Sequence, residues 1–235
     1  MRTALVTGAS SGIGAAISRR LVHDGARVAG LARRTDRLQA LSDELGEAFL
    51  PVPCDITEHE ALRNAVQQVR TALGPIDTVV ANAGVGADSA LVDGDPAAWR
   101  RTLDVNVWAA MACVREVLND LTDAGQVVFI GSMSGHRVPT GAGMYAASKF
   151  ALKAIAQGLR QELRAAGRMI RVAHISPGVV ETRFGLFAHE PDRASLVGFP
   201  PLTAPDIADI VSYVLDAPAH VDITDVLVRP TQQLS

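Results

Sequence analysis

Cysteine, lysine, aromatic residues and long apolar runs are all scarce in this sequence of 235 residues. The two cysteines, Cys54 and Cys113, stand in no CxxC pair and in no Cys/His cluster with metal-ligand spacing. We therefore expect no disulfide framework and no metal site, and this cysteine usage favours a cytoplasmic protein. No run approaches the roughly 18 apolar residues of a membrane-spanning helix. A strand-like run begins too close to Met1 to leave room for a secretory signal.

The charge of the chain argues against two classes of partner. Charged residues make up 20% of the sequence, and 22 basic and 25 acidic residues give a net charge of −3. Without a basic stripe, neither nucleic acid nor a membrane surface is an expected partner. The 48% of hydrophobic residues is enough to build a core. The length predicts one domain over residues 1–235.

Short apolar runs alternate with segments of helical periodicity along the whole chain. The expected strands are 3–7, 27–31, 49–53, 77–81, 126–131, 169–175 and 224–228. The expected helices are 12–24, 36–45, 58–72, 97–121, 143–166 and 205–216, and Thr203 and Asp206 have the spacing of a capping box at the last one. Alternation of this kind is typical of βαβ units, so we predict an α/β fold with a doubly wound parallel sheet and helices on both faces.

A glycine-rich turn follows the first expected strand and opens a helix. It reads Thr7-Gly8-Ala9-Ser10-Ser11-Gly12-Ile13-Gly14. Glycine lets the backbone turn tightly and approach a pyrophosphate, which then sits on the unpaired N–H groups at the helix start. An ordinary glycine-rich turn is the alternative, but its position between a strand and a helix favours nucleotide binding.

Tyr145 and Lys149 form a Tyr-x-x-x-Lys pair on an expected helix. Residues four apart share a helix face, so the ammonium can lie near the phenol and favour its ionised form. An unperturbed phenol has a pKa near ~10, and a lower value would make Tyr145 a usable acid or base. A chance surface pair is the alternative. Composition favours the catalytic interpretation, because the chain has only two lysines, and we interpret the other, Lys153, as a solvated helix residue.

Several motifs together resemble one family, the short-chain dehydrogenases/reductases, over almost the whole chain. They are Thr7–Gly14, Asp55, Asn82-Ala83-Gly84, Asn106, Ser132 thirteen residues before Tyr145, Tyr145-x-x-x-Lys149 and Pro177-Gly178-x-Val180-x-Thr182. Each motif is weak alone, whereas the combination is specific. The resemblance implies a Rossmann fold with seven parallel strands in the order 3-2-1-4-5-6-7. It also implies hydride transfer between a nicotinamide cofactor and a small-molecule carbonyl/alcohol pair, and a homodimer or homotetramer.

The resemblance further implies a role for each matching position. Tyr145 would exchange a proton with the substrate oxygen that Ser132 holds, and Lys149 would bind the nicotinamide ribose and lower the pKa of Tyr145. Asn106 would hold a water that links Lys149 to solvent. The implied cofactor-binding residues are Gly8, Ser10, Ser11, Gly12, Ile13, Gly14, Asp55, Ile56, Asn82, Ala83, Gly84, Tyr145, Lys149, Pro177, Gly178, Val180 and Thr182.

The end of the second expected strand favours NADP(H) over NAD(H). An NAD-selective site has an acidic residue there to accept hydrogen bonds from the ribose. This chain has Ala32 instead, followed by Arg33 and Arg34. Guanidinium groups suit a 2′-phosphate, so we predict that these two arginines bind it. The alternative is that both arginines only face solvent.

Apolar residues near the expected substrate end predict a small to medium substrate with apolar character. We expect Met144 and Phe184 to contact it beside Ser132 and Tyr145, with 183–202 as a lid. Arg137 and Arg183 leave a carboxylate-bearing substrate open. The run 226–231 is similar to a branch of serine/allo-threonine dehydrogenases and a clavulanic-acid-pathway reductase. Two competing hypotheses are an epimerase or dehydratase with the same fold, and a catalytically silent NADP-binding regulator.

Three further interpretations concern residues near the site and the long helix. Ser134 competes with Ser132, which has the better spacing to Tyr145. We interpret His136 as a solvated loop residue and His174 as a satisfied core histidine. The helix 97–121 is apolar over more of its circumference than one sheet contact requires, which predicts a surface shared between protomers.

Overall fold

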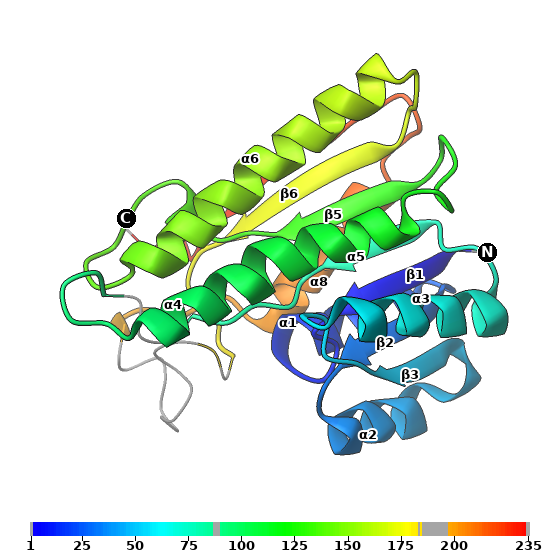
Figure 1. Cartoon of the computed structure of the whole chain (residues 1–235), viewed down its shortest axis with the longest axis horizontal. Helices are drawn as coiled ribbons and strands as arrows, with labels where there is room; N and C mark the ends of the chain where they lie inside the picture. The colour runs from blue at the N-terminus through cyan, green and yellow to red at the C-terminus, as the bar shows by residue number, and fades with distance from the viewer. Residues whose placement is uncertain (1, 87–89, 183, 185–196, 234–235) are drawn as a thin grey trace.

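The computed structural model describes residues 2–86, 90–182, 184 and 197–233. Its strands are β1 (Thr3–Thr7), β2 (Arg27–Ala32), β3 (Phe49–Pro53), β4 (Thr78–Ala81), β5 (Gln126–Ile130), β6 (Arg171–Pro177) and β7 (Asp225–Val228). All pair in parallel in one sheet, in the order β3-β2-β1-β4-β5-β6-β7 (Figure 1). The predicted fold and strand order are confirmed.

Helices cover both faces of this sheet. They are α1 (Gly12–His23), α2 (Thr35–Leu45), α3 (His59–Leu73), α4 (Pro96–Leu103), α5 (Ala110–Val117), α6 (Gly143–Ala165) and α8 (Ala204–Leu215), with short 3-10 turns η1 (Gly46–Ala48) and η3 (Met133–Gly135). Apolar residues of α3, α5 and α6 form one core cluster with the sheet, and those of α1, α2 and α8 form a second. Figure 1 shows α3, α4, α5 and α6 together on one face.

The central strands alternate their side chains between these two clusters. Leu5 and Val79 belong to the cluster of α3, α5 and α6, whereas Val6 and Val80 belong to that of α1, α2 and α8. This is the period of two that a strand imposes. Since both faces are covered, the strands read as continuous apolar runs, which is why the sequence identified them.

The helix expected over 97–121 is interrupted. A π-helical turn, η2 (Asp104–Ala109), separates α4 from α5, and α5 ends at Val117. The turn contains Asn106, which is 1% exposed and bonded to a neighbouring loop. A π turn inserts an extra residue into the helix and often marks a functional site. Apolar periodicity alone does not reveal such an insertion.

The last helix begins as its sequence predicted. The Thr203 hydroxyl accepts from the backbone N–H of Asp206, whose carboxylate accepts from Thr203 in return. This capping box satisfies N–H groups that lack partners within the helix. Among the described helices, none is long and apolar enough to cross a bilayer.

Candidate active site

A cavity of about 970 Å³ opens at the carboxyl ends of the parallel strands. In a doubly wound sheet this edge is the usual place for a ligand. Most of the predicted site residues line it: Gly8, Ser10, Ser11, Gly12, Ile13, Arg33, Arg34, Asp55, Ile56, Asn82, Ala83, Gly84, Ser132, Tyr145, Lys149, Pro177, Gly178, Val180, Thr182 and Phe184. Of the predicted set, Gly14, Asn106 and Met144 are not among the lining residues.

Gly8 and Gly14 bring the first turn against the loop after β4. Gly8 has φ 71°, a left-handed conformation that favours glycine, and a Cβ there would lie 2.9 Å from Asn82 Nδ2. A Cβ on Gly14 would clash with the carbonyl oxygen of Gly8. Gly14 therefore allows the turn to pack closely, and the pyrophosphate contact implied for it stays a prediction.

Thr7 fastens the same two loops together. Its Oγ1 accepts hydrogen bonds of 3.0 Å from the backbone N–H groups of Asn82 and Ala83, and its carbonyl oxygen accepts one of 2.9 Å from Asn82 Nδ2. The side-chain amide of Asn82 thus makes its hydrogen bond within the protein. It fixes the spacing between the carboxyl ends of β1 and β4, where the cavity begins.

Arg34 lies against the glycine-rich turn. Its guanidinium donates to Ser10 Oγ at 3.1 and 2.8 Å and to Ser11 Oγ at 2.5 Å. Two hydroxyls and a guanidinium therefore converge at the mouth of the cavity. Such a set of donors suits a phosphate group, which accepts charge-assisted hydrogen bonds.

A cluster of opposite charges lines the same cavity. Arg33 lies 3.7 Å from a carboxylate oxygen of Asp55. Burial alone would raise the pKa of Asp55, but hydrogen bonds from Thr57 and the charges of Arg33 and Arg101 lower it overall. Sequence reasoning missed Arg100 and Arg101, which line the cavity from α4. No motif marked them, because in sequence they are ordinary charges on an amphipathic helix.

Ser132 and Tyr145 meet at the other end of the cavity. Ser132 is the N-cap of η3, two residues after β5 ends at Ile130, and its Oγ accepts a hydrogen bond of 3.1 Å from the Ser134 N–H. Tyr145 lines the same cavity, and its interaction with Ser132 acts to lower the pKa of the phenol. Ser134 thus supports Ser132 through its backbone, and among the residues lining the cavity Ser132 is present and Ser134 is not.

The pKa of Tyr145 shifts in the direction opposite to the expectation. Burial raises it to about 12, and the interaction with Ser132 lowers it only in part. The ammonium of Lys149 is 5.7 Å from the centre of the tyrosine ring and donates to the carbonyl oxygen of Ile130 at 3.0 Å. Burial lowers the pKa of Lys149 to about 8. Helical spacing correctly placed the two groups near each other, but desolvation is the main cause of both pKa shifts.

Asn106 is buried behind the residues that line the cavity and forms hydrogen bonds to them and their neighbours. Its Oδ1 accepts from the Val85 N–H at 2.8 Å, and its Nδ2 donates to the Val85 carbonyl and to Ser148 Oγ at 2.8 and 3.0 Å. A Cβ on Gly84 would lie 3.3 Å from Asn106 Oδ1 and 3.7 Å from Lys149 Nζ. Asn106 and Lys149 therefore approach the same glycine, on the loop that follows β4.

Phe184 packs on Tyr145, with ring centres 5.7 Å apart. A Cβ on Gly86 would lie about 3 Å from both rings, so this glycine lets the loop approach them. Most of the expected lid, including Arg183, lies outside the described residues. Arg137, the other arginine considered for a carboxylate, is not among the residues that line the cavity.

Two interpretations of neighbouring side chains were wrong. His136 is half-buried and contacts Ser176 Oγ and Lys153 Nζ, each at 3.0 Å, so it is not a solvated loop residue. Lys153 also pairs with Asp225 at 3.2 Å and is not simply solvated. His174 is buried as expected, at 2% exposure, with Nδ1 partnered and Nε2 without a hydrogen-bond partner in the described part of the chain.

Residues 2–190 match the family model described as short chain dehydrogenase. The chain belongs to the short chain dehydrogenase family. It is 40% identical over 249 positions to "Dehydrogenase/reductase SDR family member 11" of Gallus gallus, covering 100% of this chain and 98% of that one. It is also 37% identical to a farnesol dehydrogenase of Aedes aegypti, covering 97% and 96% of the two chains.

A solved structure supports the same assignment. The closed form of a serine dehydrogenase complexed with NADP⁺ superposes with a TM-score of 0.93 at 29% identity, covering 99% of this chain and 96% of that one. The chain is therefore an oxidoreductase with the fold and motif order of its family.

Proposed function

We propose that this short chain dehydrogenase interconverts a carbonyl and an alcohol with NADP(H), within a single domain, on a small to medium substrate of apolar character. The observation that carries the proposal is that Ser132, Tyr145 and the buried Lys149 line one cavity. A regulator without catalysis would have no need of these three groups together.

The residues at the mouth of the cavity fit NADP(H). The start of α1 offers unpaired N–H groups to the pyrophosphate, and Gly8 and Gly12 line the cavity there without a side chain in the way. Arg34, Ser10 and Ser11 would hold the 2′-phosphate, assisted by Arg33. The absence of an acidic residue at Ala32 removes the group that would repel this phosphate.

The remaining predicted residues fit the rest of the cofactor. Asp55 and Ile56 line the cavity where adenine would bind, and Asn82, Ala83 and Gly84 follow its length. Pro177, Gly178, Val180 and Thr182 line the end where the nicotinamide would meet the substrate. When bound, NADPH supplies the hydride for reduction, and NADP⁺ accepts it for oxidation.

Tyr145 would donate a proton to the substrate oxygen in reduction and accept one in oxidation. With a pKa raised to about 12, its phenol stays protonated at neutral pH and is ready to donate to the substrate oxygen during reduction. Ser132 would hold that oxygen, and the ammonium of Lys149 would stabilise the phenolate that forms. Asn106 would act through the loop after β4, which it binds at Val85.

The described substrate end favours an apolar molecule over a hydroxy amino acid. The apolar side chains of Phe184 and Val179 line the cavity. A farnesol dehydrogenase among the relatives is consistent with an apolar substrate. The similarity to a serine dehydrogenase keeps the hydroxy amino acids as the second candidate.

Paired assays distinguish the two substrate classes. One measures NADPH oxidation with hydrophobic ketones and aldehydes, and the other measures NADP⁺ reduction with serine and allo-threonine. We expect turnover of the hydrophobic carbonyls. Efficient oxidation of the amino acids without any turnover of the hydrophobic set would contradict the proposed substrate class.

A further inference from the structure

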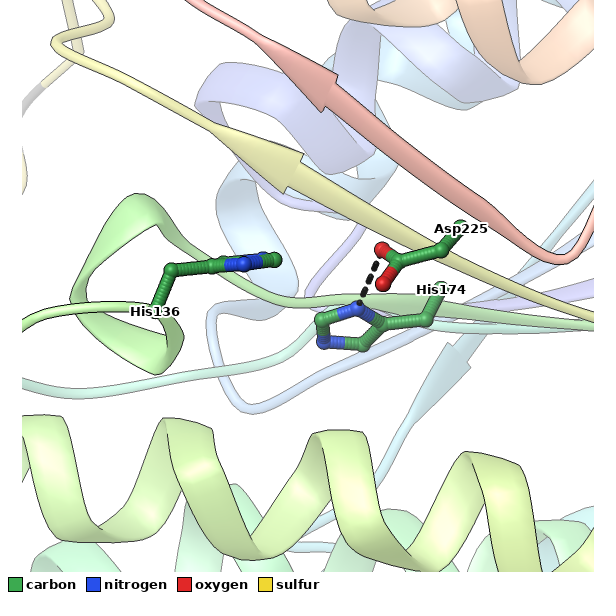
Figure 2. A group of neighbouring side chains, drawn as sticks. All are labelled: His136, His174 and Asp225. Atoms are coloured by element: carbon green, nitrogen blue, oxygen red, sulfur yellow. Dashed lines mark hydrogen bonds and ion pairs between the residues drawn. The ribbon is translucent and has the colours of Figure 1, made fainter.

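A polar network lies behind the turn that carries Ser132. It contains His136 from the loop after η3, Lys153 from α6, His174 and Ser176 from β6, and Asp225 from β7. Figure 2 shows His136 reaching from its loop toward the strands that hold His174 and Asp225. The two imidazole ring centres are 6.3 Å apart. None of these five residues has a role in the function proposed above.

The contacts of His136 indicate which of its ring nitrogens donates and which accepts. Nζ of Lys153 lies 3.0 Å from Nδ1, and Oγ of Ser176 lies 3.0 Å from Nε2. An ammonium can only donate, so Nδ1 accepts from Lys153 and the ring proton is on Nε2. The neutral imidazole therefore donates to Ser176 and accepts from Lys153, which ties its loop to β6 and to α6 at once.

The rest of the network holds these two partners in place. Lys153 Nζ also lies 3.2 Å from Asp225 Oδ2, and His174 Nδ1 lies 3.3 Å from Asp225 Oδ1 and 3.2 Å from Ser176 Oγ. Two histidines and a carboxylate this close could hold a metal ion. Here, however, the ammonium of Lys153 already bonds to both His136 and Asp225 and supplies the positive charge.

The anchored loop is the one that positions Ser132. The His136 N–H donates to the Met133 carbonyl at 2.9 Å, which closes the turn that Ser132 begins. Gly135 packs on α6, where a Cβ would lie 2.9 Å from the carbonyl oxygen of Lys149. Ser176, the partner of His136 on β6, directly precedes Pro177 of the cavity lining. His136 thus bridges two walls of the cavity without lining it.

We propose that His136 is a positioning residue, which holds the η3 turn between α6 and β6 so that Ser132 stays in register with Tyr145. This inference rests on the proposed function, because it concerns the same reaction. Loss of His136 should therefore slow turnover while leaving the Kd of NADPH unchanged, because the residues proposed to hold its phosphates lie at the opposite end of the cavity.

The test compares His136→Ala, His136→Gln, Ser176→Ala and the double variant His136→Ala/Ser176→Ala with His220→Ala, which removes an exposed histidine. We expect His136→Ala to lower kcat about tenfold. This is the effect expected if a displaced Ser132 loses about one hydrogen bond to the substrate oxygen in the transition state. The Kd of NADPH should stay within about twofold. Glutamine offers an N–H near Nε2, so His136→Gln should recover much of kcat. The double variant should be no slower than His136→Ala, because both changes remove one interaction.

Several results would overturn the proposal. The first is an unchanged kcat in His136→Ala. The second is an equal loss of kcat in His136→Ala and His136→Gln, accompanied by matching losses in Tm and in NADPH affinity, which would indicate general destabilisation. The third is a double variant whose loss of kcat equals the two single losses combined. If the unmodified protein reduces no carbonyl, the proposed function fails instead. Amide hydrogen exchange over residues 133–137 then decides the positioning role. Exchange at least about fivefold faster in His136→Ala than in His220→Ala supports it, and equal exchange refutes it.

Discussion

Replacing Lys149 by methionine should abolish activity and at the same time stabilise the fold. Lys149 is 4% exposed, and burial lowers the pKa of its ammonium from 10.5 to about 8. Its one hydrogen bond among the described residues goes to the uncharged carbonyl of Ile130. A shift of this size corresponds to about 3 kcal/mol of unfavourable free energy while the group is charged. After subtracting about 1 kcal/mol for the lost hydrogen bond, Lys149→Met should gain about 2 kcal/mol at neutral pH.

The pH dependence of unfolding separates this effect from better packing. Because the folded-state pKa lies below the unfolded one, the folded protein binds fewer protons between about pH 8 and 10.5, and its stability rises with pH in that window. Urea unfolding at about pH 7 and about pH 9.5 should show the advantage of Lys149→Met shrinking by about 2 kcal/mol. Other titrating groups are common to both proteins and cancel in the difference. An advantage that is absent at pH 7, or that does not change with pH, would refute the reasoning.

Four further outcomes are expected. Arg34→Ala should raise the Kd of NADPH about tenfold or more and leave the Kd of NADH unchanged, because only NADPH carries the 2′-phosphate. Arg63→Ala, which removes an exposed arginine, is the control. Equal changes in Kd for both cofactors would count against the phosphate site. Carbonyl reduction should decline as pH rises through about 8, because deprotonated Lys149 no longer stabilises the phenolate, and a flat kcat profile from about pH 6 to about pH 10 would contradict this. Gly14→Ala should destabilise the fold by about 1–3 kcal/mol in thermal unfolding, because the new Cβ meets a backbone oxygen, and an unchanged Tm would be inconsistent with that contact. Sedimentation should show a dimer or tetramer that Trp108→Glu weakens, since this exposed tryptophan lies on the predicted shared helix; a monomer at micromolar concentration would disprove it.

The central strands were predictable because each is buried on both faces and so reads as an apolar run between turns. Val127 to Ile130, for example, are all nearly inaccessible to solvent. The break at η2 was not predictable, because it depends on Asn106 finding partners on a loop that is 21 residues away in sequence. Local propensity carries no information about such a contact.

Motif spacing located most of the candidate site, but it did not determine the electrostatics. The interval from Ser132 to Tyr145 placed both side chains in one cavity. The pKa of Tyr145 depends on burial, which is a property of the assembled fold. For the same reason His136 and Lys153 were interpreted as solvated, since their partners come from β6 and β7, late in the chain.

The most direct test of the proposed function is the rate of NADPH-dependent carbonyl reduction by Tyr145→Phe beside the unmodified protein, with NADPH binding measured in both. This change removes only the phenolic oxygen, so binding of NADPH should persist. The account predicts that kcat falls at least about a hundredfold, the usual contribution of a positioned acid. A variant that binds NADPH and reduces the carbonyl at the unmodified rate would contradict it.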